Sequence, residues 1–174
     1  MPYESSLFRT IRSRPSAARG SAAPYVDCST TGEGIAAEMP EPNRLVLDTS
    51  AILAMRSDEA GADRVESLLR SARAGRATVL LSFMTRMELL YRIGADEGQD
   101  AADAAIRLLD AAGIEWVSCE AAILEEAARI KAGGGLSVAD AWIAATAAVR
   151  DAILVHKDPE FTRAPGIRQG RLRR

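Results

Sequence analysis

The chain has 174 residues, and 48% of them are hydrophobic but only 5% aromatic, so aliphatic side chains must form most of the core. The net charge of −2 gives by itself no sign of nucleic-acid binding. No apolar run approaches the roughly 18 residues that span a bilayer, and the first residues lack the apolar stretch of a secretory signal. We therefore expect a cytoplasmic protein without membrane contact. The two cysteines, Cys28 and Cys119, are far apart and typical of free thiols.

The first 43 residues differ in composition from the rest of the chain. They are rich in Pro, Ser, Ala and Gly and show no sustained hydrophobic period, so they bury too little apolar surface to offset the entropy of ordering. We predict a disordered N-terminal extension over residues 1–43, with Met39 as an alternative start, and one folded domain over residues 44–174.

From Arg44 onward, short apolar runs alternate with helical patterns. Residues Val65, Leu68, Leu69 and Ala72 follow the i, i+3, i+4, i+7 spacing of a helix, and Gly94 is the expected end of another helix. The predicted strands are 44–48, 77–82, 114–118 and 152–156, and the predicted helices are 51–55, 58–74, 83–93, 98–112, 119–132 and 137–151. This alternation predicts an α/β three-layer sandwich whose sheet of four or five strands is mainly parallel.

Four acidic residues follow or begin successive elements of this predicted sheet. Asp48 ends the first strand, Glu88 is on the helix after the second, Asp140 is in the first turn of the helix 137–151, and Asp158 follows the last strand. Ligands of open α/β sheets bind beyond the carboxyl ends of the strands, so we expect these four side chains to share one edge.

Each of these acids also has a purely local interpretation. Asp48 is suited to cap the following helix, Asp140 completes a capping box with Ser137, Glu88 is placed to pair with Arg92 at i+4, and Asp158 before a proline starts a turn. Taken one at a time, the acids favour these structural roles; the joint arrangement favours a functional site.

Clustered carboxylates repel one another unless a cation neutralises them. Mg²⁺ prefers oxygen ligands and is commonly bound by carboxylates, water and substrate phosphates. The four acids thus suggest a site for Mg²⁺, or Mn²⁺, that serves phosphodiester hydrolysis without a protein nucleophile.

Four segments in register carry a resemblance to a known family: LVLDTSAIL (45–53), MTRMELLYRIG (84–94), LSVADAWIAATA (136–147) and ILVHKDPEF (153–161). The chain resembles PIN-domain ribonucleases, most closely the VapC-type toxins of prokaryotic toxin–antitoxin modules. This resemblance implies a PIN-like nuclease domain over 44–174 and a metal-dependent endoribonuclease that cleaves RNA. It also implies that Asp48, Glu88, Asp140 and Asp158 are the catalytic and metal-binding acids, with the hydroxyl of Thr49 or Ser50 beside the first of them.

The same resemblance implies an antitoxin protein as partner and a homodimer. Segregated basic residues offer surfaces for RNA or for an acidic antitoxin segment: six arginines lie between Arg64 and Arg92, and five follow Phe161. Solvated faces produce such runs more often. The alternatives are an RNA-processing nuclease that is not a toxin, and a PIN-fold module that binds RNA or protein without catalysis.

One position departs from the family pattern, because His156 stands where a hydroxyl residue is common. As the only histidine it is a candidate general base, against the simpler role of a residue at a strand end. Other phosphate-handling classes are excluded by missing motifs: there is no GxxxxGK[ST] loop, and Ser50 occupies the place of the second aspartate of a haloacid-dehalogenase-like phosphatase.

Overall fold

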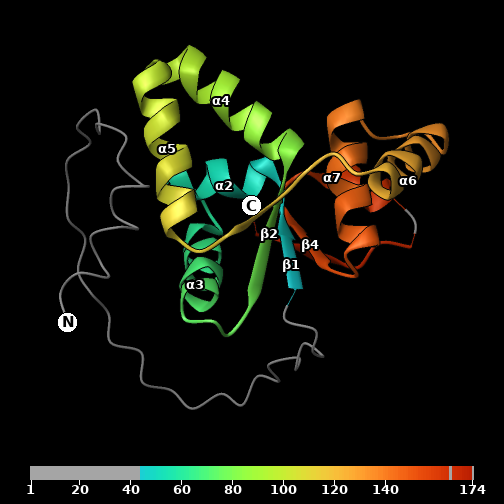
Figure 1. Cartoon of the computed structure of the whole chain (residues 1–174), viewed down its shortest axis with the longest axis horizontal. Coiled ribbons are helices and arrows are strands. Elements are labelled where there is room, and N and C mark those ends of the chain that lie inside the picture. Colours follow the sequence, from blue (N-terminus) through green and yellow to red (C-terminus); the bar gives the residue numbers. More distant parts are fainter. Residues whose placement is uncertain (1–43, 165, 174) are drawn as a thin grey trace.

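The computed structural model describes residues 44–164 and 166–173 (Figure 1). The expected extension 1–43 lies outside these residues. Within the described ranges the chain forms the following strands and helices: β1 (Arg44–Leu47), α2 (Thr49–Arg56), α3 (Ala62–Arg73), β2 (Thr78–Ser82), α4 (Phe83–Glu97), α5 (Gln99–Ala111), β3 (Glu115–Val117), α6 (Ala121–Ala132), α7 (Val138–Val149), β4 (Ile153–His156), the 3-10 helix η1 (Pro159–Arg163) and β5 (Gln169–Arg171). None of the helices in this part of the chain is long and apolar enough to cross a membrane.

The five described strands form one parallel sheet in the order β3-β2-β1-β4-β5. The first strand, β1, is central and pairs with β2 on one side and β4 on the other. Since every strand runs in the same direction, the carboxyl ends of all five lie at one edge. The predicted α/β fold class with a mainly parallel sheet is confirmed.

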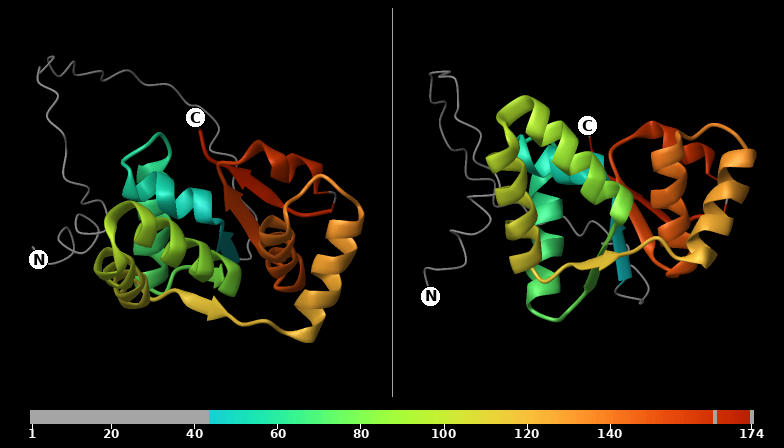
Figure 2. Two further views of the ribbon diagram at one scale, coloured as in Figure 1. Left: turned by 90° about the horizontal axis from the view of Figure 1, so that it is seen from above. Right: turned by 45° about the horizontal axis from the view of Figure 1, so that its top comes forward.

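Alternate residues of the central strands pack on opposite faces of the sheet. Leu45 and Leu47 join a core with α2, α3, α4 and α5, whereas Val46 joins a second core with α6 and α7. Figures 1 and 2 show α3 and α5 on one side of the strands and α6 and α7 on the other. Helices therefore cover both faces, as the three-layer prediction requires, and the polar edge of the sheet is left for a site.

The strand β5 has no counterpart among the strands predicted from hydrophobic periodicity. Its three residues, QGR, contain no apolar side chain, and it pairs only with β4, at the border of the sheet. Gly170 lies against Ile153 and Val155, where a small residue allows close approach. The next residue but one, Leu172, is buried in the first core. A short border strand held by its neighbours carries too little pattern for periodicity to detect.

The helix α4 does not end at Gly94, contrary to the prediction. It continues to Glu97, and Gly98 both ends α4 and begins α5, with φ 95° and ψ 159°. A glycine inside a helix costs stability but does not have to stop it. The turn itself needs the backbone conformation that Gly98 supplies.

These two glycines should respond to alanine in opposite directions. Gly94→Ala should raise the free energy of unfolding by up to about 1 kcal/mol, because alanine is the better helix former; the new Cβ would make only an ordinary contact, 3.4 Å from the Gln99 Oε1 atom. Gly98→Ala should lower it by about 1–3 kcal/mol, because its backbone conformation is nearly exclusive to glycine. Urea unfolding of both variants measures the two changes. A stabilised Gly98→Ala protein would contradict the assignment of the turn.

Candidate active site

Asp48 is the most enclosed of the four predicted site residues. It follows β1 directly, and only 3% of its surface is exposed. Its backbone N–H donates to the Val155 carbonyl at 2.9 Å, which continues the pairing of β1 with β4. Its side chain caps α2, accepting from the backbone N–H of Ser50 at 2.9 Å and from the Ser50 hydroxyl. The predicted capping role is thus real, and it holds the carboxylate at the carboxyl edge of the central strand.

The two hydroxyl residues after Asp48 contact different carboxylates. While the Ser50 hydroxyl donates to Asp48, the Thr49 Oγ1 atom donates to Oε2 of Glu88 at 2.5 Å. Thr49 is buried, and Glu88 on α4 is half-buried. The predicted i+4 ion pair between Glu88 and Arg92 is not among the ion pairs of the described residues. Glu88 therefore faces the start of α2 and the first acid.

Burial and neighbouring charge raise the pKa of Asp48 to about 6. Loss of hydration by burial is the largest cause; the two hydrogen bonds from Ser50 act in the opposite direction, and the charges of Asp140 and Glu88 raise the pKa further. A carboxylate responds in this way when it shares a low-dielectric site with like charges. Asp48, Glu88 and Asp140 therefore lie close enough to interact electrostatically at one edge of the sheet.

Asp140 has the local role predicted for it as well. Ser137 caps α7, its hydroxyl accepting from the Asp140 backbone N–H at 3.0 Å, and the Ser137 backbone N–H donates to Oδ2 of Asp140 at 3.3 Å. These two bonds form the predicted capping box. Because Asp140 also raises the pKa of Asp48, the capping box orients a carboxylate that lies near Asp48 and Glu88. We call this group of carboxylates at the carboxyl ends of the strands the acidic edge.

Asp158 lies at the same edge of the sheet but in a different setting. Its Oδ1 atom accepts from the backbone N–H of Glu160 at 2.8 Å and caps η1. The carboxylate is half-buried and lines a pocket that also contains Ser50. The chain therefore places Asp158 beside the edge, on the loop that follows β4.

His156 is a structural residue rather than a base at this edge. Its ring is fully buried, its Nδ1 atom donates to the Asp158 carbonyl at 2.6 Å, and it packs on Phe161 with ring centroids 5.0 Å apart. Burial lowers the pKa of His156, which favours the neutral form. The ring therefore supports the β4–η1 loop and has no access to a substrate.

The acidic edge fits a divalent cation by the chemistry of its donors. Asp48 is buried without a cationic partner among its hydrogen bonds. Its pKa is raised first by burial and then by the charges of Asp140 and Glu88, and a bound cation would favour the ionised form against both. Within residues 44–164 and 166–173, no three acidic, histidine or cysteine side chains gather closely enough to form a metal-binding group. The carboxylates are thus neighbours at one edge without forming a finished coordination shell.

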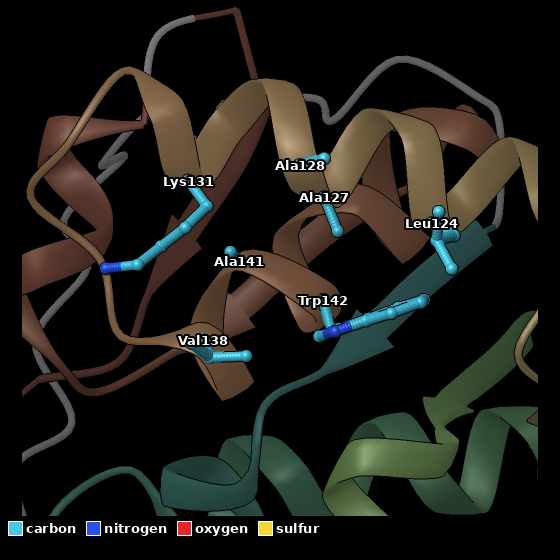
Figure 3. A pocket seen from close by; sticks show the side chains of 7 residues that line it. All are labelled: Leu124, Ala127, Ala128, Lys131, Val138, Ala141 and Trp142. Atoms are coloured by element: carbon cyan, nitrogen blue, oxygen red, sulfur yellow. The ribbon is translucent and has the colours of Figure 1, made fainter.

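Two hollows flank different parts of the molecule. One, of about 280 Å³, is lined by Ser50, Leu53, Ala54, Glu59, Arg92, Lys157, Asp158 and Pro159, and it is next to Asp48 through the Ser50 hydroxyl. The other, of about 170 Å³, is an apolar groove between α6 and α7, with the Trp142 ring along one side and Lys131 at one end (Figure 3). The sequence offered Arg92 only as the end of a basic run and did not single out Lys157, because the cations of this hollow come from segments far apart in the chain.

Comparison with known proteins agrees with this architecture. The model of the PIN domain family matches residues 45–167, so the chain belongs to the PIN domain family. Solved structures with the same fold include the promoter-bound VapBC2 complex of Rickettsia felis, with 18% identity, TM-score 0.61 and coverage of 75% of this chain and 99% of that chain. The DNA-bound VapBC of Salmonella typhimurium has 22% identity, TM-score 0.60 and coverage of 73% and 96%.

A third structure is that of Mycobacterium tuberculosis VapC20, a toxin described as cleaving the sarcin–ricin loop. It has 19% identity and a TM-score of 0.55, and the match covers 70% of this chain and 95% of that one. At these identities the likeness establishes the shared fold. No curated protein sequence matches the chain.

The raised pKa of Asp48 predicts a cost of ionisation in the metal-free protein. Because the folded pKa is above the ordinary value of 3.8, the folded state binds the proton more tightly, and stability falls as pH rises from about 4 to about 6. Asp48→Asn removes this cost and should raise the free energy of unfolding at pH 7.5 by up to about 3 kcal/mol. Near pH 4 the gain should largely vanish.

Urea unfolding with EDTA at both pH values provides the measurement. Glu125→Gln is the matched control, because Glu125 is exposed in the middle of α6. An equal gain for Asp48→Asn at both pH values would show that the stabilisation has another origin than the charge.

Proposed function

We propose that this chain is a metal-dependent endoribonuclease that hydrolyses RNA phosphodiester bonds, and that it is the toxin of a toxin–antitoxin module. The observation that carries the proposal is the buried Asp48, held at the carboxyl edge of a PIN domain with Glu88 and Asp140 close enough to raise its pKa. The neighbouring structures of VapBC complexes support the assignment to a toxin.

Asp48 and Asp140 are the proposed principal ligands of Mg²⁺ or Mn²⁺, with Glu88 and Asp158 completing the site directly or through water. A divalent cation bound there supplies an acidified water and neutralises charge that develops on the phosphate. The chain's own contribution is orientation: Ser50 holds the Asp48 carboxylate, Thr49 holds that of Glu88, and the capping box holds that of Asp140.

An antitoxin and a second copy of the chain are the proposed protein partners. Leu124 and Val138 border the groove between α6 and α7, and 49% and 59% of their surfaces are exposed. On α4, Met87 and Tyr91 are similarly exposed, at 47% and 57%. These four large apolar side chains are exposed to solvent, and such exposure supports a protein-binding role for the surfaces that carry them. An antitoxin arginine that reached the acidic edge would form charge-assisted contacts in competition with the cation.

An RNA cleavage assay tests the proposed catalytic role of the acidic edge. The full chain should cleave a mixed pool of RNA in Mg²⁺ or Mn²⁺, and excess EDTA should abolish the activity. Asp48→Asn should lower the rate by at least about a hundredfold, because it removes charge at the position where the cation binds. Glu125→Gln should retain the full rate. Equal cleavage with and without EDTA would refute the metal requirement, and a wild-type chain that is inert and harmless on expression would favour the non-catalytic alternative.

The ends of the products test the mechanism separately. We expect 5′-phosphates and 3′-hydroxyls, because hydrolysis by a water molecule does not involve the RNA 2′-hydroxyl. The only histidine, His156, is buried and bound to the Asp158 carbonyl, so it has no access to that hydroxyl. Mapping of RNA ends after brief expression of the wild type and of Asp48→Asn gives the result. Products that carry 2′,3′-cyclic phosphates would overturn the mechanism based on the acids.

A further inference from the structure

The hollow next to Asp48 contains an arginine that the proposed chemistry at the acids does not use. We propose that Arg92 binds a phosphate of the RNA strand in this pocket and so positions the strand for cleavage at Asp48. This inference rests on the proposed ribonuclease function and adds a substrate-positioning residue to it.

The pocket is continuous with the acidic edge through Ser50. This residue lines the pocket, its hydroxyl donates to Asp48, and the same oxygen accepts from the backbone N–H of Lys157 at 3.0 Å. Asp158 also lines the pocket. With a volume of about 280 Å³, the hollow has room for a phosphate group and part of its sugar. An RNA strand whose scissile phosphate lies at Asp48 can thus place a neighbouring phosphate here.

The pocket lining carries two acids, Glu59 and Asp158, and two cations, of which Arg92 makes no direct ion pair among the described residues. The Asp158 carboxylate accepts from the Glu160 backbone N–H. Lys157 is matched by Glu59, with 2.5 Å between its Nζ atom and the Glu59 Oε2 atom. Glu88, one helical turn before Arg92, accepts instead from the Thr49 hydroxyl. Arg92 has no ion pair with any residue in the described part of the chain. A free guanidinium offers paired N–H donors with the geometry that phosphate oxygens accept.

Four other arginines of the basic segment 64–92 lie elsewhere. Arg70 pairs with Glu66 on α3, and Arg86 stacks over the Trp116 ring, 4.9 Å from its centroid. Arg73 and Arg76 lie between the end of α3 and the start of β2, at the edge of the sheet opposite to the acids. Arg92 is the arginine of this segment that lines the pocket.

The first test measures binding of a short single-stranded RNA in EDTA, where no cleavage occurs, as a function of salt. Arg92→Gln should weaken binding about tenfold and make the slope of log K against log salt shallower by about 0.7, the loss of one phosphate contact. Arg92→Lys should keep the slope and part of the affinity. Arg107→Gln is the matched control, because Arg107 is exposed on α5 and should leave both values unchanged.

The second test identifies the phosphate. RNA oligonucleotides that carry one neutral methylphosphonate at successive positions near the cleavage site are bound to the wild type and to Arg92→Gln. At one position the wild type should lose about tenfold in affinity while Arg92→Gln loses almost nothing, because the contact is already absent. Arg107→Gln should behave as the wild type at every position.

The outcomes separate this inference from the function on which it rests. In one outcome the wild type cleaves RNA, but Arg92→Gln and Arg107→Gln have the same salt slope, the same affinity and the same response to methylphosphonates. This outcome would overturn the role of Arg92 and leave the ribonuclease function intact. Unchanged RNA binding by Arg92→Gln with a loss of inhibition by a co-expressed antitoxin would also overturn it and assign the pocket to the partner protein. A wild-type chain that neither binds nor cleaves RNA would refute the function and the inference together.

Discussion

The burial of the Asp48 carboxylate at the end of the central strand is the constraint on which the other features of the site depend. Its backbone is bound to β4 through the Val155 carbonyl, and both faces of the sheet behind it are covered by helices. A carboxyl group in such a place needs local donors, a cation or a proton. Ser50 supplies the donors, yet burial and the charges of Asp140 and Glu88 still raise the pKa of Asp48 to about 6, so these donors do not fully offset the loss of hydration.

The hydrogen bonds around this carboxylate join elements that are distant in the chain. Ser50 connects Asp48 to the backbone of Lys157 after β4, and Thr49 connects the same turn to Glu88 on α4. Two adjacent hydroxyl residues thus hold three segments at one point. The arrangement costs stability in the absence of a cation and is maintained by packing elsewhere, as is usual where a protein keeps like charges together for function.

The charged and the apolar surfaces are separated on the molecule. The acids and the pocket with Arg92 lie at the carboxyl edge of the sheet, whereas the groove between α6 and α7 is lined mainly by aliphatic side chains and Trp142 (Figure 3). Such a division fits the proposed function, in which RNA binds at one surface and a partner protein at another. It also shows that linear charge runs are a poor guide here, since Arg70 and Arg86 are engaged with neighbouring side chains.

The sequence by itself determined the alternation of the first four strands with six helices, the two covered faces, and the four acids as candidates, because hydrophobic period and capping residues are local signals. It also indicated both capping roles, of Asp48 and of Asp140, which the structure contains. Only the tertiary structure decided that Gly98 rather than Gly94 ends α4, that β5 completes the sheet, and that His156 is enclosed. Only the tertiary structure also decided that Glu88 accepts from Thr49 and does not pair with Arg92, since Thr49 lies 39 positions away from Glu88 in the chain. Contacts of this kind depend on how the crossover helices place each strand in the sheet. The hydrophobic pattern of a short segment does not determine that geometry.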